Sequence, residues 1–348
     1  MTGSGFPTFA GVLCNLCALI IGVFFLLDAF VKRYFPKASF GLFSLLYLFL
    51  VLGSGTFLMA VTPTFYNMPI SMGAALSVWG LYFWMRASEE EKLKKGWLFT
   101  GAVFMAAVAA CRPQFLVFSL LAAVLFGGRL IKQFKKGRQG VREGIKSSLC
   151  IFVPFIIIGG LLMYYNKARF GSAFDFGANY NLTTNDMTSR GFHLDRLPFG
   201  LFMYLLQPPE IGGRFPFLFA SRMSPSYQGI TIYEAMYGGF LWYYPICAVF
   251  VFAGQIKRRL KEKGLWGFCL LSAALGVLVV CADIQMAGIL QRYWSDFGLL
   301  FLLPAEVFAM ALEERASENG AWRTVFGKGL FWTAAGTMLI NGLWLLAH

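Results

Sequence analysis

Long apolar stretches alternate with short polar connections along nearly the whole chain. A helix needs about 20 predominantly apolar residues to cross the hydrocarbon core of a bilayer. About ten stretches approach this length: 8–31, 39–62, 68–86, 97–111, 114–131, 149–165, 237–254, 265–284, 292–312 and 328–347. The pattern predicts an all-α fold, a polytopic transmembrane helical bundle of about ten spans that forms a single transmembrane domain over residues 1–348.

The stretches 97–111 and 114–131 are short and are joined by Cys111-Arg112-Pro113. Proline is tolerated in the first turn of a helix, and the residue before it avoids helical backbone geometry. We therefore expect a tight helical hairpin with Arg112 at its tip.

Residues 166–236 form the one large interruption of the apolar pattern. This segment is rich in Asn, Gly and Pro, which favour turns, and its acidic and basic residues nearly balance. Two apolar patches lie within it, Leu201 to Leu206 and Phe215 to Phe219. These patches predict short interfacial helices on the membrane surface, with Tyr and Phe at headgroup depth.

Composition supports membrane residence and excludes a soluble globule. Of the 348 residues, 58% are hydrophobic and 14% are charged, whereas soluble domains carry about 25% charged residues. The net charge of +13 does not indicate nucleic-acid binding, because the basic residues sit in short clusters between apolar stretches. Such clusters are the usual signal of membrane topology.

Most of the 30 Lys and Arg residues lie in or beside the odd-numbered connections. Because basic loops stay in the cytoplasm, this distribution predicts that those connections are cytoplasmic. Both termini and the segment 166–236 are then extracytoplasmic. Asp28 precedes Lys32 by one helical turn, so we expect an ion pair at the end of the first span.

Arginine residues on the outer side are the best candidates for binding chemistry. The guanidinium group is a planar fork of donors that suits phosphate oxygens. We expect Arg112, Arg292 with its neighbour Tyr293, Arg214 and Arg222 to face an outer cavity that binds a lipid phosphate. The alternative is that each Arg meets bulk lipid phosphate or a nearby Asp.

The motifs of common enzyme classes are missing from the sequence. There is no phosphate-binding glycine loop, no nucleophile elbow and no metal-ligand spacing, and His193 is the only internal histidine. No catalytic residue is assigned and no cofactor is expected, while a divalent metal is left open.

Four short motifs carry a resemblance to a known family. They are Phe65-Tyr66-Asn67-Met68-Pro69, Cys111-Arg112-Pro113-Gln114, the segment 166–177, and Gln291-Arg292-Tyr293-Trp294. In this order the chain resembles bacterial membrane glycosyltransferases of the GT-C superfamily, relatives of the protein O-mannosyltransferases and aminoarabinose transferases. The resemblance covers nearly the whole chain.

The resemblance implies a bacterial inner-membrane protein with a polyprenyl-phosphate-linked sugar donor. It also implies transfer on the extracytoplasmic face to a glycan, lipid or protein acceptor. Arg112 and Arg292 match positions where such enzymes often keep an Arg near the lipid-phosphate cavity.

One departure from the family pattern is large. The catalytic acidic residue of the family lies in the first outer loop, but no acidic residue precedes Asp28 here. We therefore expect that an upstream helix and the catalytic loop are missing from this chain; a natural chain without that catalysis is the alternative.

Two other function classes are open. A lipid-linked glycan polymerase or ligase also combines many spans with a long outer loop. A transporter or flippase for lipid-linked sugars is disfavoured, because transporters tend to show internal repeats and polar residues in mid-membrane.

Overall fold

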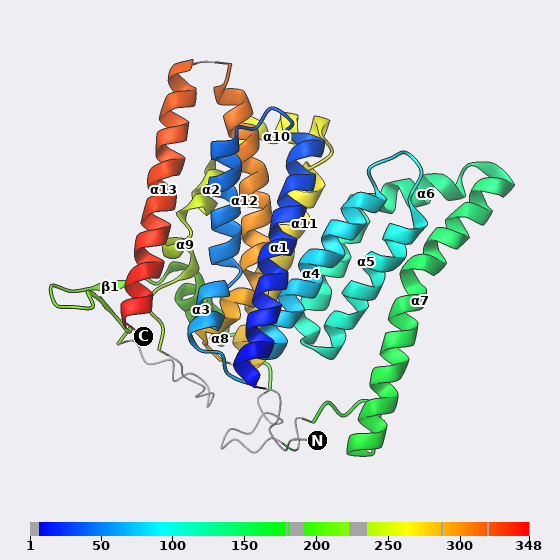
Figure 1. The fold of residues 1–348 in the computed structure, drawn as a ribbon, viewed down its shortest axis with the longest axis horizontal. Helices are drawn as coiled ribbons and strands as arrows, with labels where there is room; N and C mark the ends of the chain where they lie inside the picture. Colours follow the sequence, from blue (N-terminus) through cyan, green and yellow to red (C-terminus); the bar gives the residue numbers. More distant parts are fainter. Residues whose placement is uncertain are drawn as a thin grey trace.

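The computed structural model describes residues 7–177, 180, 191–222, 235–286, 288–318 and 320–347. Most of them are helical, as the apolar pattern predicts (Figure 1). Six helices in this part of the chain are long and apolar enough to cross a membrane: Thr8–Tyr34, Pro113–Phe134, Gly137–Phe170, Trp266–Met286, Gln291–Ala316 and Gly320–Ala347. The chain is therefore a membrane-embedded helical bundle, and the count of about ten spans stays a prediction.

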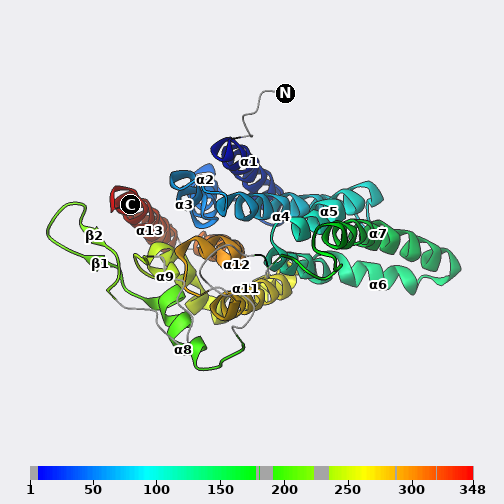
Figure 2. The same cartoon turned by 90° about the horizontal axis from the view of Figure 1, so that it is seen from below.

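Helix α12 (Trp294–Ala316) is the centre of the bundle. Every residue of this helix from Trp294 through Leu312 is buried. Figure 2 shows it enclosed by its neighbours α2 (Phe40–Gly53), α11 (Trp266–Met286) and α13 (Gly320–Ala347). Side chains on this helix are therefore shielded from lipid on all sides.

A row of helices extends to one side of this core (Figures 1 and 2). The members are α1 (Thr8–Tyr34), α4 (Asn67–Ala87), α5 (Lys95–Ala107) with η1 (Val108–Ala110), η2 (Pro113–Leu121), η3 (Ala123–Gly127), α6 (Gly128–Phe134) and α7 (Gly137–Phe170). Within the row, α1 packs on α4, α4 packs on α5, and α7 packs on both α5 and α6. The segment η2 packs against both α4 and α11 and so joins the row to the core.

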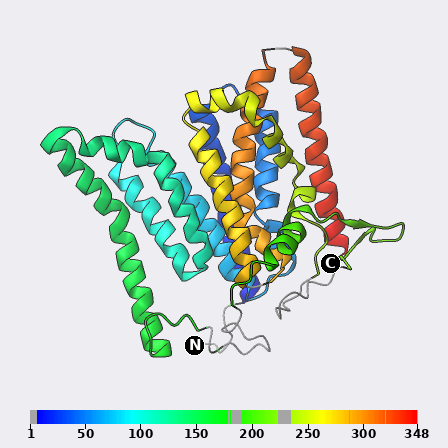
Figure 3. The same cartoon turned by 180° about the vertical axis from the view of Figure 1, so that it is seen from behind.

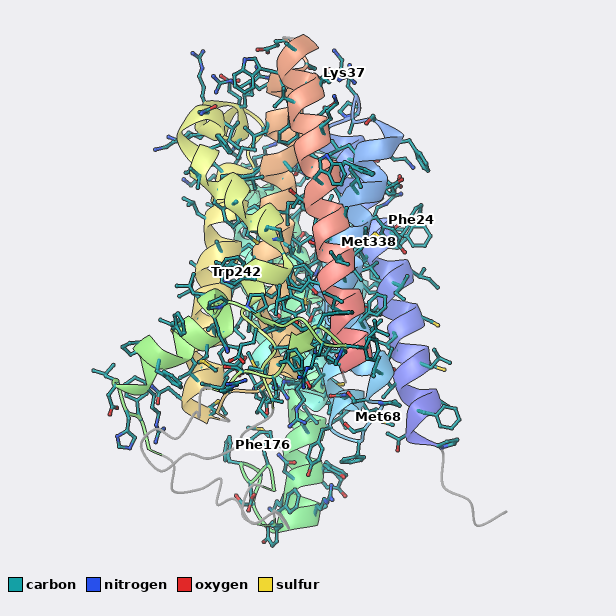
Figure 4. The ribbon with its side chains drawn as sticks, turned by 90° about the vertical axis from the view of Figure 1, so that its left-hand side faces the viewer. Phe24, Lys37, Met68, Phe176, Trp242 and Met338 are labelled. Carbon is teal, nitrogen blue, oxygen red and sulfur yellow. The ribbon has the colours of Figure 1, made fainter. Side chains whose placement is uncertain are left out.

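The two ends of the bundle differ in charge. The basic clusters at 32–37, 92–95, 132–146 and 257–263 lie together at one end, which we call the basic end (Figure 1). The start of α1, the finish of α13 and the segment 191–222 lie at the other, which we call the loop end. Figure 4 places Lys37 at the basic end and Met68 near the loop end. This is the grouping of connections that the charge distribution predicts.

Two expected spans are interrupted. The stretch 39–62 breaks between α2 and α3 (Thr56–Val61), where Gly55 has the left-handed conformation (φ +78°) that glycine adopts readily. A side chain would not fit at this position, because its Cβ would lie 1.8 Å from Ser295 Oγ. The stretch 237–254 breaks at Tyr244, which precedes a proline and leaves helical geometry. Three short elements follow one another there: α9 (Phe240–Tyr243), η6 (Pro245–Phe252) and α10 (Ala253–Glu262).

Of the two predicted interfacial helices, the first is present and the prediction of the second is wrong. Leu201 to Leu206 is helical, within α8 (Arg196–Leu201) and η5 (Phe202–Leu206). Residues 215–219 instead belong to a hairpin of β1 (Glu210–Ile211) and β2 (Leu218–Phe219), with Glu210 opposite Phe219. Phe217 has a positive φ of 71°, outside helical geometry, so these residues do not form a helix. Residues 178–179, 181–190 and 223–234 of the long segment lie outside the described residues.

Candidate functional site

The ring of Tyr293 lies between two of the predicted arginines. It belongs to η7 (Gln291–Tyr293), the short turn that leads into α12 at the loop end. The guanidinium carbon of Arg112 is 4.2 Å from the ring centre, and that of Arg292 is 5.6 Å from it. Arg292 also lies 5.3 Å from the ring of Tyr66. Cation–π contacts of this kind hold Arg112, Arg292 and Tyr293, three of the five predicted residues, in one cluster.

Arg112 forms a buried salt bridge across the bundle. Its Nε and Nη2 donate to Oδ2 of Asp296 at 2.8 and 2.5 Å, and Asp296 is fully buried. Asp296 follows Tyr293 by three residues, so the two share one face of the helix. For Arg112, the structure therefore supports the alternative of a nearby Asp partner.

Electrostatics keep Arg112 charged. It precedes the apolar segment Pro113–Phe134, and burial alone would lower the pKa of its guanidinium. The Asp296 carboxylate outweighs that effect and raises the pKa above its usual value.

A second carboxylate lies close to this salt bridge. Asp283 on α11 is fully buried, and neither of its oxygens has a hydrogen-bond partner among the described residues. It interacts electrostatically with both Asp296 and Arg112. Asp283 and Asp296 were not among the predicted site residues. Their signal was available, because acidic residues inside the stretches 265–284 and 292–312 are expensive at membrane depth.

A cavity of about 310 Å³, with polar side chains in a largely apolar lining, opens at the loop end beside Arg292. Pockets for small ligands begin at about this size. The cavity is lined by Leu58, Thr62, Thr64, Asn67, Ala235, Tyr237, Gln291, Arg292 and Trp344. These residues come from the turn between α3 and α4, from residues 235–237, from η7 and from the last turns of α13.

Two side chains that line this cavity, Asn67 and Gln291, each have one amide atom in a hydrogen bond and one without a partner in the described structure. Asn67 donates from Nδ2 to the carbonyl oxygen of Thr62 at 2.5 Å, and Gln291 accepts the backbone N–H of Tyr237 at 3.2 Å. Asn67 Oδ1 and Gln291 Nε2 are buried and have no hydrogen-bond partner among the described residues. Buried polar groups usually find partners. These two amide atoms are themselves covered by their neighbours, and the charged member of the cavity lining is Arg292.

Arg214 and Arg222 do not join this cluster, contrary to the expectation of one shared cavity. Arg214 lies in the exposed connection between β1 and β2. Arg222 is 93% exposed and its Nε is 3.6 Å from a carboxylate oxygen of Glu210. Figure 2 shows the β1–β2 hairpin projecting outward from the bundle, well away from α12. The sequence does not reveal this because it cannot place a loop relative to the spans.

A third buried acid lies halfway along α12. Glu306 is 1% exposed, and neither of its carboxylate oxygens has a hydrogen-bond partner among the described residues. It interacts electrostatically with Cys247 of η6. Polar side chains occur nearby in the core: Tyr244 donates to the carbonyl oxygen of Leu52 at 2.9 Å and lies 3.4 Å from Asn341 Oδ1. The bundle interior is thus more polar than its sequence pattern predicts.

The ion pair predicted near the end of the first span is present, with 2.8 Å between Lys32 Nζ and Asp28 Oδ2. Within the described ranges, no group of three or more His, Cys, Asp or Glu residues could hold a metal ion. The chain was compared with protein-family models, with curated proteins and with solved structures, and nothing matches it in any of the three comparisons.

Proposed function

We propose that this chain is a membrane glycosyltransferase of the GT-C type that takes a sugar from a polyprenyl-phosphate-linked donor. Transfer takes place on the extracytoplasmic face of a bacterial inner membrane, to a glycan, lipid or protein acceptor. The observation that carries this proposal is the cavity lined by Arg292 at the loop end of an apolar bundle. A lipid-linked sugar needs such a site, because its phosphate lies at the membrane surface while its chain stays in the bilayer.

The cavity chemistry supports a phosphate ligand. Arg292 supplies a planar cation, and charge-assisted hydrogen bonds from Arg to phosphate are among the stronger ones in proteins. Thr62 and Thr64 line the same cavity and add hydroxyl groups to it.

Replacing Arg292 with Gln should weaken binding of a polyprenyl-phosphate sugar by about 10- to 100-fold, the loss expected for one hydrogen bond to a charged group. Binding is measured with radiolabelled donor and the purified full chain in lipid nanodiscs. The substitution removes the charge and leaves a shorter polar side chain that can still form hydrogen bonds.

Arg222→Gln is the matched control, because Arg222 carries the same charge at the loop end but is exposed on the hairpin. Its donor affinity should stay within about twofold of the unmodified protein, as expected for a rim charge. Equal affinities for the two variants would remove Arg292 from the site. No binding of the donor to the unmodified protein would remove the proposed function.

A transporter of lipid-linked sugars is the second candidate, and Glu306 is the observation that favours it. A buried ionisable residue in mid-membrane marks ion or substrate pathways in many transporters. Glu306 lies in the middle of α12 with both carboxylate oxygens unpartnered within the described structure.

If the chain is a transporter, Glu306→Gln should lower the rate of donor translocation in proteoliposomes by about tenfold or more, since it removes the only proton that the side chain can exchange. Translocation is followed by the protection of a fluorescent donor analogue from an external reductant. Glu313→Gln is the control on the same helix, because Glu313 lies at the basic end within 3.5 Å of Arg323. Equal rates for both variants, or no translocation by the unmodified protein, would exclude this second candidate.

A further inference from the structure

We propose that the basic end carries a binding site for one anionic glycerophospholipid, between α10 and the first turns of α13. This inference is independent of the proposed function, because it concerns the opposite end of the bundle.

Helix α10 lies across the basic end of the bundle rather than along it (Figure 3). Its Ile256 and Leu260 are fully buried, whereas Lys257, Arg258 and Lys261 are exposed. A helix with one apolar face and a basic opposite face is typical of segments that lie in the membrane interface. The exposed face of α10 is therefore at the depth of lipid headgroups.

An apolar groove of about 560 Å³ lies beside α10, and we call it the basic-end groove. Its walls come from the last residue of η6, the end of α12 and the start of α13. Apolar side chains form most of it, namely Phe252, Leu312, Trp322, Val325 and Phe326. Trp322 and Val325 are 66% and 61% exposed, so the groove opens toward the lipid side of the bundle. An acyl chain can enter it from the bilayer.

Polar groups border this groove where it reaches the basic end. Gln255, Arg315 and Glu318 complete its lining, and Arg315 Nη1 donates to the carbonyl oxygen of Gln255 at 2.8 Å. A second cavity of about 560 Å³ lies along the same helix and is lined by Arg258, Arg259, Glu262, Lys263 and Glu314. Apolar walls and a basic rim thus meet at α10, which is the arrangement that a phospholipid requires.

The acids at this end are already paired within the protein. Glu318 accepts from Arg259, and Glu314 lies 3.2 Å from Lys263. Arg258 pairs with Glu262 at 2.9 Å but remains 92% exposed, so this pair is weak. Six basic residues on and beside α10 face three acids, and the surplus of positive charge selects an anionic headgroup. Basic pockets between membrane helices on the basic side are known to bind anionic lipids.

The test measures which lipids the full chain retains. The protein is purified from an equimolar mixture of phosphatidylglycerol and phosphatidylethanolamine, and bound lipid is counted by native mass spectrometry. Phosphatidylglycerol should be retained preferentially. Arg258→Gln with Arg315→Gln should lower its retention by about 10- to 30-fold, because two cations near the phosphate are lost.

Two further variants separate this site from general attraction to a basic surface. Val325→Trp keeps every charge and fills the basic-end groove, so it should also abolish preferential retention. Arg138→Gln with Arg142→Gln removes the same charge from exposed positions of α7 at the same end, and should change retention by less than twofold.

The site is wrong if the unmodified protein retains both lipids equally. It is also wrong if the α7 variant loses as much lipid as the Arg258 and Arg315 variant, or if Val325→Trp retains as much as the unmodified chain. Elution of each variant as a single symmetric peak in size-exclusion chromatography shows that it is folded.

Discussion

Arg112→Met is expected to lower the free energy of unfolding by about 3–5 kcal/mol, the usual effect of removing one partner from a buried salt bridge. Asp296 accepts both of its described hydrogen bonds from Arg112 and is fully buried. Asp283 lies nearby with no hydrogen-bond partner among the described residues, and Arg112 attracts it too. Without the guanidinium, two carboxylates face each other in a medium that solvates neither of them.

The loss is measured as a lower temperature of thermal unfolding for the full chain in detergent, followed by fluorescence-detected size-exclusion chromatography. Arg214→Met is the matched control, because it removes the same group from the exposed hairpin and should change stability by no more than about 0.5 kcal/mol. An Arg112→Met variant as stable as this control would show that the salt bridge does not hold η2 to α12.

A second substitution tests the cause of that loss. Asp296→Asn removes one of the two negative charges that Arg112→Met leaves behind. The double variant should therefore regain part of the lost stability, because replacing a buried ion pair as a whole costs far less than breaking it. If the double variant is less stable than Arg112→Met alone, the two substitutions act independently and the loss has another origin.

The salt bridge gives Arg112 and Arg292 different roles, although the sequence predicts phosphate binding for both. Arg112 and Arg292 both flank Tyr293. Arg112 donates hydrogen bonds from two of its nitrogens to Asp296, whereas Arg292 lines the cavity at the loop end. We therefore expect substitutions of Arg112 to act first on folding and those of Arg292 to act first on ligand binding. Donor affinity normalised to folded protein distinguishes these two effects.

Much of the fold could be predicted because it depends on local patterns. Apolar stretches of known length locate the helices, and clusters of Lys and Arg group the connections at one end. The Asp28–Lys32 pair follows from helical spacing alone, and the break at Cys111-Arg112-Pro113 follows from proline.

The remaining features depend on contacts between distant parts of the chain. Arg112 and Asp296 are 184 residues apart, and no periodicity relates them. Position 55 requires glycine because Ser295 of α12 occupies the space that a side chain would need. The sequence shows acids within apolar stretches at Asp283, Asp296 and Glu306. Only the packing of the helices shows that these acids are buried and that Asp296 forms a salt bridge with Arg112.

The approach of α2 to α12 leads to the second large effect. A Cβ added to Gly298 would lie 2.2 Å from the carbonyl oxygen of Gly53, and a Cβ added to Gly53 would lie 2.0 Å from Leu302 Cδ1. The first of these contacts is with backbone, which no rotation of a side chain can relieve. The two helices must therefore separate if Gly298 is replaced, whereas at Gly53 a new rotamer of Leu302 can relieve the contact.

Gly298→Val should accordingly destabilise the full chain by about 3 kcal/mol or more, at the upper end of what overpacking costs in well-packed cores. Thermal unfolding in detergent provides the measurement. Gly336→Ala is the control within a membrane helix, because a Cβ at Gly336 in α13 would meet no atom within 4 Å. Higher helix propensity alone should leave that variant unchanged or stabilise it by up to about 1 kcal/mol. Opposite signs for the two substitutions would establish that contact with α2, rather than glycine itself, decides the outcome at position 298. A stable Gly298→Val protein would mean that α2 does not lie against α12 at Gly53.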